Sequence, residues 1–143
     1  MRYLVDTVTL SELRRGKKAH PSVIQWQQTL EDVWISVITL NEIRYGLKQV
    51  ERSDPLFAEI LAAWYARLLT QPDRFRVLPV DRPIAEHAAD FRAAHSTSIN
   101  DSLIAATAMV HKLTVATRNV SDFAPTGVRV LNPWKSRGPL RNG

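Results

Sequence analysis

The chain of 143 residues is long enough to bury a sizeable core and too short for two full-sized domains. Hydrophobic residues make up 45% of it and charged residues 23%, which excludes a disordered composition, and the absence of Cys excludes disulfide frameworks, thiolate nucleophiles and Cys-ligated metal centres. Lys and Arg together number 19 against 14 Asp and Glu, and this net charge of +5 favours a polyanionic partner.

Short apolar runs rich in β-branched residues predict five buried strands, at residues 3–5, 33–38, 77–80, 113–116 and 128–131. Between them, apolar side chains recur at helical spacing over residues 40–50, 57–69, 84–95 and 102–112. Ser53-Asp54-Pro55 separates the first two of these helices, and Asp54 is expected to cap the second. Short strands that alternate with helices predict an α/β domain with a mostly parallel sheet and right-handed crossovers.

No internal repeat or linker divides the chain, so we expect one domain over residues 1–134. Residues 135–143 have little apolar content and are expected to form a flexible basic tail. No apolar run approaches the roughly 18 residues that a membrane span needs, and the opening run is too short for the apolar core of a secretory signal. We therefore expect a cytoplasmic protein without membrane contact.

Acidic side chains follow the predicted strands. Asp6 ends the first strand, Glu42 lies in the first turn after the second, and Asp101 opens the last long helix. Asn119 and Asp122 follow the fourth strand. Ligands of open α/β sheets bind outside the carboxyl ends of the strands, and grouped carboxylates there suit Mg²⁺ or Mn²⁺. The sequence thus predicts a metal site, because carboxylates in one cleft would repel one another without a cation.

Each acid also has a purely structural explanation. Residues 39–42 (Thr-Leu-Asn-Glu) and 98–101 (Ser-Ile-Asn-Asp) have the form of capping boxes at helix starts. Asp6 is positioned to cap the helix around residues 10–13, and Asp122 to cap the turn at Phe123. Singly, the acids do not distinguish a helix cap from a metal ligand, and only their predicted convergence favours the metal site.

Four motifs follow one another along the chain: residues 6–12 (DTVTLSE), 38–46 (ITLNEIRYG), 101–108 (DSLIAATA) and 116–123 (ATRNVSDF), with a closing Asn132-Pro133-Trp134. In this order and spacing they resemble the PIN-domain family, particularly the VapC/FitB-like toxins of bacterial toxin–antitoxin pairs. The resemblance runs from about Arg2 to Trp134. It implies a three-layer α/β/α domain with a central five-stranded, mostly parallel sheet, and a ribonuclease site that depends on Mg²⁺ or Mn²⁺.

The resemblance also assigns roles to individual residues. The three carboxylates that bind metal and serve catalysis in the family match Asp6, Glu42 and Asp101, and a fourth position, often Asp, matches Asn119. Val8 stands where Asn is common. Both departures remove polar groups near the metal, so one bound ion is the safer expectation than two. Asp122 is a secondary candidate for the missing acid.

Two threonines lie beside the matched positions. Thr7 and Thr117 are candidates to hydrogen-bond a metal-bound water or to fix a carboxylate, and the alternative is that they hold the backbone at a strand end. Asn119 would act as a neutral ligand or as a hydrogen-bonding neighbour of one. The family further implies an RNA substrate, a cognate antitoxin partner that occupies a basic and apolar groove beside the acids, and a homodimer.

Basic residues surround these motifs and are candidates to bind RNA phosphates: Arg14, Arg15, Lys17, Lys18, Arg44 and Arg118. The alternative is an ordinary solvated surface and, for Arg118, an internal salt bridge with a carboxylate. Val8 and Asn119 also keep open a PIN-like protein-binding module with weak or no nuclease activity, which would act within a DNA-bound regulatory complex. A phosphatase of the haloacid dehalogenase type is disfavoured, because it needs a second acid where this chain has Val8.

Overall fold

A five-stranded parallel sheet forms the centre of the protein in a computed structural model that describes residues 1–135. Of the predicted tail at 135–143, all but Lys135 lies outside the described residues. The sheet has the order β3-β2-β1-β4-β5, and every adjacent pair is parallel, as predicted. The strands are β1 (Tyr3–Val5), β2 (Val33–Ser36), β3 (Phe75–Leu78), β4 (Thr114–Ala116) and β5 (Val130–Leu131).

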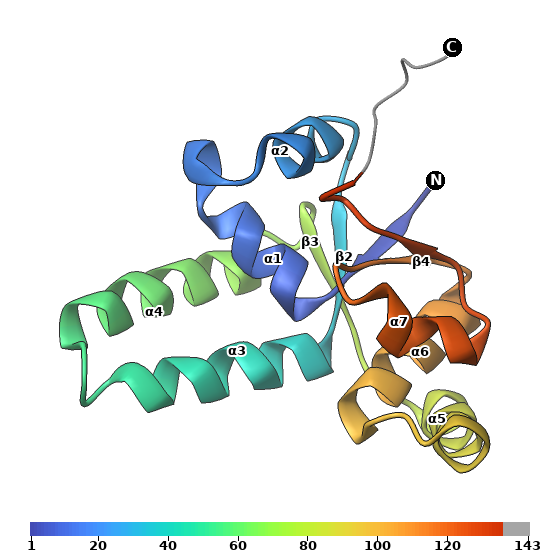
Figure 1. The fold of residues 1–143 in the computed structure, drawn as a ribbon. Helices are drawn as coiled ribbons and strands as arrows, with labels where there is room; N and C mark the ends of the chain where they lie inside the picture. The colour runs from blue at the N-terminus through green and yellow to red at the C-terminus, as the bar shows by residue number, and fades with distance from the viewer. Residues whose placement is uncertain (136–143) are drawn as a thin grey trace.

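Helices cover both faces of this sheet, which gives three layers (Figure 1). Helices α1 to α4 lie on one side and α5 to α7 on the other (Figure 1). Short 3-10 turns follow α1 and α7, at Gly16–Lys18 and Ala124–Thr126. The α-helices are α1 (Thr7–Arg14), α2 (Pro21–Gln27), α3 (Val37–Val50), α4 (Pro55–Thr70), α5 (Arg82–His95), α6 (Ile99–His111) and α7 (Val120–Phe123).

The alternation of side chains along β1 shows why both faces need a cover. Leu4 and Val5 are both fully buried, although successive side chains of a strand point to opposite faces. Val5 packs into a cluster with Trp26 on the α1–α4 side, and Leu4 packs into one with Ile104 and Phe123 on the other. A strand this short and apolar therefore has to lie in the middle layer.

Some element boundaries differ from those predicted. The second strand ends at Ser36 rather than at residue 38, because the Ser36 hydroxyl accepts from the Ile38 backbone N–H at 3.0 Å and starts α3. The third strand covers Phe75–Leu78 instead of 77–80, and α6 begins at Ile99 instead of 102. The fourth and fifth strands start slightly later than predicted. Asp54 caps α4, as predicted.

The predicted capping box at residues 39–42 is wrong. Since α3 already begins at Val37, Thr39 and Glu42 both lie inside the helix. The Thr39 hydroxyl is buried without a hydrogen-bond partner among the described residues, and Glu42 bonds to other helices. Glu42 is therefore not engaged in a local cap.

None of the helices in residues 1–135 combines the length and apolar character needed to cross a membrane.

Candidate functional site

The order in which the chain adds strands to the sheet reverses between β1 and β4. From β1 the chain order runs one way through β2 and β3 and the other way through β4 and β5, so the carboxyl ends of β1 and β4 form the switch point where open α/β sheets bind ligands. Asp6 directly follows β1 and Thr117 directly follows β4. The Asp6 backbone N–H donates to the carbonyl oxygen of Ala116 at 3.2 Å. These two residues therefore meet where a ligand is expected.

Asp6 is buried, with 5% of its surface exposed. Its Oδ1 accepts from the Thr9 backbone N–H at 2.9 Å, which caps α1 as predicted, and its Oδ2 accepts from the Thr117 hydroxyl. Burial raises the pKa of Asp6 above its ordinary value; the hydrogen bonds from Thr117 and Thr9 oppose this rise, and the charge of Glu42 adds to it. The cap uses one oxygen, so it does not exclude a second role for this carboxylate.

Glu42 lies on α3, half-buried, with a donor on each carboxylate oxygen. The Thr7 hydroxyl from α1 donates to Oε1, and the Asn100 side-chain amide from α6 donates to Oε2 at 3.0 Å. Thr7 thus fixes a carboxylate, one of the two roles considered for it. Asn100 could not be recognised as a site residue from the sequence, because an Asn near the start of a helix is typical of a cap.

Asp101 and Asp122 line one cavity of about 290 Å³ beside the start of α6. The Ser98 hydroxyl accepts from the Asp101 backbone N–H at 3.1 Å and caps α6, as expected for the first residue of a capping box. Burial raises the pKa of Asp101; the Ser98 hydroxyl lowers it, and the charges of Asp122, Glu42 and Asp6 raise it further. The three matched carboxylates therefore act on one another electrostatically.

The loop after β4 carries the remaining polar positions. Asn119 and not Asp122 stands at the N-cap of α7, so the predicted capping by Asp122 is wrong. The Asn119 backbone N–H donates to Thr117 Oγ1 at 3.0 Å, while its exposed side chain makes no hydrogen bond within residues 1–135. Thr117 consequently connects Asn119 to the Asp6 carboxylate.

The predicted RNA-binding residues are more dispersed than the acids. Arg14 and Arg15 lie at the end of α1, about 12 Å along the helix axis from its start at Asp6, and Lys17 and Lys18 follow in the next turn. Arg15 pairs with Glu12 at 3.1 Å. Three guanidinium groups of this set lie over aromatic rings: those of Arg14 over Phe57, Arg44 over Tyr65 and Arg118 over Trp134.

These positions answer one of the questions about the basic residues, the salt bridge of Arg118. The salt bridge considered for Arg118 is absent from the described residues, and its guanidinium lies 5.3 Å from the Trp134 ring centre instead. Lys17 and Lys18 are exposed and form no ion pair with another residue in 1–135. The two lysines thus have neither an acidic partner nor an aromatic ring beside their charge in this part of the chain, whereas Arg14, Arg44 and Arg118 each lie on a ring.

Asp6, Glu42 and Asp101 match a hard divalent cation in donor type, because all three offer carboxylate oxygens. No Lys or Arg in residues 1–135 forms an ion pair with any of them, so their negative charge is uncompensated. No three acidic or His side chains of this part of the chain stand close enough together to hold one ion as they lie. The residues therefore fit such an ion by chemistry and charge, without forming a closed cage.

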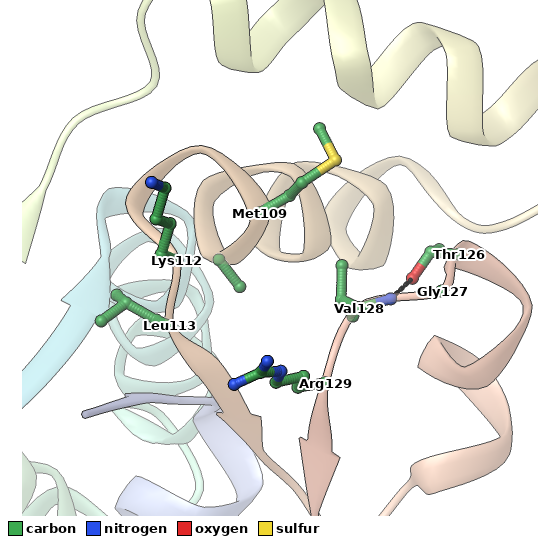
Figure 2. A pocket seen from close by; sticks show the side chains of 8 residues that line it. Met109, Lys112, Leu113, Thr126, Gly127, Val128 and Arg129 are labelled. Atoms are coloured by element: carbon green, nitrogen blue, oxygen red, sulfur yellow. Dashed lines mark hydrogen bonds between the residues drawn. The ribbon is translucent and has the colours of Figure 1, made fainter. Parts of the chain in front are cut away.

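Another cavity, of about 370 Å³, lies at the amino ends of β4 and β5, opposite the carboxyl ends where the acids lie. Figure 2 shows Lys112 and Arg129 at its wall, with Met109 and Val128 as apolar neighbours. The hydrogen bond drawn there joins Thr126 Oγ1 to the Val128 backbone N–H, at 3.4 Å. None of the predicted site residues lines this cavity, so it is separate from the acidic site.

Comparison with known proteins identifies relatives that match more than nine-tenths of the chain. The chain is 34% identical to Toxin FitB of Neisseria gonorrhoeae over 138 residues, 92% of this chain and 97% of that protein. The crystal structure of FitAcB from that organism matches with a TM-score of 0.76 and 34% identity, over 94% of this chain and 99% of that one. VapC ribonuclease Y4jK of Sinorhizobium fredii is 34% identical over 146 residues, 92% of this chain and 97% of that protein.

A toxin–antitoxin complex from Klebsiella pneumoniae has the same fold, with a TM-score of 0.68 and 25% identity over 95% of this chain and all of that one. The family model of the PIN domain matches residues 3–125, which include all three matched carboxylates and the loop after β4. Four of the five strands, β1 to β4, and the acids near the switch point belong to this matched region, and β5 follows it. The chain is therefore a member of the PIN-domain family.

Proposed function

We propose that this protein is an endoribonuclease toxin of a toxin–antitoxin pair, which hydrolyses RNA phosphodiester bonds at an acidic, Mg²⁺- or Mn²⁺-dependent site. The observation that carries the proposal is that three acids from separate parts of the chain lie within electrostatic reach of one another near the switch point of the sheet: Asp6 at the N-cap of α1, Glu42 on α3 and Asp101 on α6. Relatives that match more than nine-tenths of the chain carry the names toxin and ribonuclease, which supports it.

Asp6, Glu42 and Asp101 would hold the ion, directly or through water, and Asn119 would contribute as a neutral ligand or a neighbour of one. A divalent ion held by these residues would supply Lewis acidity for a phosphate oxygen and for the attacking water, and positive charge for the leaving oxygen. The Thr117 hydroxyl holds one oxygen of Asp6 in place, and the α1 cap holds the other. No side chain of the protein needs to act as a nucleophile.

The decisive experiment replaces Asp101 by Asn, which keeps the shape of the side chain and removes its charge. Mg²⁺-dependent cleavage of single-stranded RNA should fall by about 100-fold or more, since even residues that only support metal ligands contribute 10–100-fold. Asp81→Asn is the matched control, because Asp81 also opens a helix and Asn caps equally well. Thermal unfolding checks that both variants fold. Cleavage by Asp101→Asn at the wild-type rate would contradict the assignment.

An antitoxin would dock in the groove between α3 and α4, which has a volume of about 520 Å³. The apolar lining comes from Leu40, Tyr45 and Tyr65. Arg44 supplies a positive charge, and it lies two residues after Glu42 on α3. An antitoxin segment with acidic and apolar side chains suits such a groove. Arg44→Glu should weaken co-purification with the product of the adjacent gene. Undiminished co-purification would place the antitoxin elsewhere.

Toxicity itself is tested by expressing the chain alone in a bacterial host. Growth should stop with the wild-type chain and continue with Asp6→Ala, because Asp6 is central to the acidic site. Arrest by both versions would mean that the acidic site does not cause it. We expect the toxin to act in the cytoplasm. We also expect it to form a homodimer, and light scattering of the purified chain tests this oligomeric state.

A second candidate function is a PIN-like protein-binding module with weak or no nuclease activity, acting within a DNA-bound regulatory complex. It is favoured by the open arrangement of the acids in residues 1–135 and by Asn119 at a position that is often acidic. Titration calorimetry with MnCl₂ separates the two functions. The nuclease gives heat that Asp6→Ala and Asp101→Asn abolish, whereas the binding module gives none.

A further inference from the structure

Glu42 is held from two sides by side chains of two other helices. The Thr7 hydroxyl donates to Oε1 from α1, and the Asn100 amide donates to Oε2 from α6 at 3.0 Å. No other side chain in residues 1–135 makes a hydrogen bond with this carboxylate. The bond from Asn100 is thus the one direct hydrogen bond in the described residues between the start of α6 and the second acid of the site.

A Glu side chain has three rotatable bonds, so a carboxylate with a donor on one oxygen only can still turn about that bond. A donor on each oxygen fixes both the position and the plane of the group. Asn100 and Glu42 are both half-buried, where few water molecules can replace a lost donor. The Asn100 amide therefore has more influence on Glu42 than an exposed side chain would.

Asn100 also precedes Asp101 directly in the first turn of α6. A bond from residue 100 to Glu42 consequently sets where Glu42 lies relative to the third acid of the site. The amide brings a partial positive charge to a carboxylate that lies within electrostatic reach of two other acids, Asp6 and Asp101. An Asp in place of Asn100 would repel Glu42, and an Ala would leave Oε2 free.

We infer that Asn100 is a positioning residue of the metal site, whose side-chain amide holds the Glu42 carboxylate in register with Asp101. The inference rests on the proposed function, because it assigns Asn100 a part in that same site. Asn100 needs no contact with the ion or with RNA for this role, and its influence passes through Glu42.

Titration calorimetry with MnCl₂ on the purified full chain tests the inference without relying on cleavage. Asn100→Ala should weaken Mn²⁺ binding by about 10–100-fold at unchanged stoichiometry, the range found when a group that supports a metal ligand is removed. Asn100→Gln, which keeps the amide on a longer arm, should recover part of the affinity. Gln25→Ala removes an exposed amide from α2, away from the acids, and should bind Mn²⁺ like the wild type.

A second measurement detects the bond in the absence of metal, by urea unfolding with EDTA present. Asn100→Ala should reduce the folding equilibrium constant by about 10-fold in the wild-type background, which is the scale of a hydrogen bond to a charged group. The reduction should be smaller in a Glu42→Gln background, because the charge that Asn100 serves is gone. Equal reductions in both backgrounds would overturn the inference.

The outcomes separate this inference from the function beneath it. If the wild-type chain gives no heat with MnCl₂, or if Asp6→Ala and Asp101→Asn leave that heat unchanged, the proposed function is refuted. The role of Asn100 is then refuted with it. A wild-type chain that binds Mn²⁺, together with Asn100→Ala binding within twofold of it, refutes the inference alone and leaves the acidic site standing.

Discussion

Replacement of Thr117 by Val should destabilise the metal-free protein by about 2–4 kcal/mol at pH 7. The Thr117 side chain is fully buried, donates its hydroxyl proton to Asp6 Oδ2 and accepts the Asn119 backbone N–H at 3.0 Å. Val has nearly the same shape, so the loss comes from the two hydrogen bonds and not from a cavity. A single hydroxyl thus supports both an acid of the site and the loop after β4.

The magnitude follows from the two partners left behind. A hydrogen bond to a charged group contributes about 1.5–3 kcal/mol, and Asp6 is too buried for water to replace the lost donor fully. The Asn119 backbone N–H loses a neutral bond worth about 0.5–1.5 kcal/mol, and exposure of Asn119 lets water offset part of that loss. Most of the destabilisation is therefore assigned to the Asp6 carboxylate.

The loss should also depend on pH, because the Thr117 hydroxyl stabilises the ionised form of Asp6. Burial already raises the pKa of Asp6, and the Thr117 bond is the largest influence that lowers it, so Thr117→Val raises this pKa further. Above the raised pKa the carboxylate is charged and the full loss is felt. As the pH falls through that pKa, Asp6 becomes neutral and the difference between variant and wild type should shrink.

Urea unfolding with EDTA at pH 7 and at about pH 4 measures these effects in wild-type and Asp6→Asn backgrounds. The loss should be much smaller with Asp6→Asn, which carries no charge. Thr70→Val is the control, since the exposed Thr70 makes one long bond, of 3.5 Å to the Arg67 carbonyl oxygen, and should change stability by less than about 0.5 kcal/mol. A Thr117→Val loss this small, or one equal in both backgrounds, would refute the reasoning.

Three further perturbations test other parts of the structure. Ser36→Ala removes the cap of α3 and should lower the free energy of unfolding by about 1 kcal/mol in urea; no change would mean that Ser36 does not start the helix. Asp101→Asn should raise the Tm of the metal-free protein at pH 7, with a gain of up to about 1 kcal/mol in the free energy of unfolding. Burial and acidic neighbours raise the pKa of Asp101, so its ionised form opposes folding above that pKa. The gain should vanish below the ordinary pKa of Asp, and a lower Tm at pH 7 would contradict the sign. Lys17→Ala and Lys18→Ala should each reduce the slope of log affinity against log salt for single-stranded RNA, measured by fluorescence anisotropy, by about one. Lys112→Ala, at the other edge of the sheet, should leave that slope unchanged, and equal slopes for all variants would remove the two lysines from the RNA-binding surface.

The central strands β1, β2 and β4 were predictable because each is a short run of mostly apolar residues that the fold buries on both faces. The edge strands β3 and β5 are only partly buried, and their predicted bounds were less accurate. The error at residues 37–38 has a clear physical reason. Val37 and Ile38 favour a strand by intrinsic preference, but the Ser36 hydroxyl satisfies the first free N–H of a helix and turns the chain there. Local capping chemistry outweighed β propensity at that step.

The position of Asp6 beside the loop after β4 was predictable for a different reason. The carboxyl ends of parallel strands share one edge of the sheet, so residues that follow different strands approach one another whatever the helices do. The bond from Asn100 to Glu42 does not follow from any such rule, because it joins residues 58 positions apart on two helices whose spacing depends on packing. Strand order thus brings Asp6 and Thr117 together, whereas the packing of α3 and α6 determines where Glu42 and Asp101 lie.

Charge is distributed in a way that favours an external cation. The chain carries an excess of +5, yet the four ion pairs among residues 1–135 all involve acids outside the set of Asp6, Glu42 and Asp101. Neutral hydroxyl and amide donors hold the oxygens of Asp6 and Glu42 instead, and these orient a carboxylate without cancelling its charge. A Lys or Arg in their place would neutralise the site and compete with a metal ion. Under the proposed function, positive charge kept apart from this centre would be available for RNA, while the centre would keep its own charge for a divalent ion.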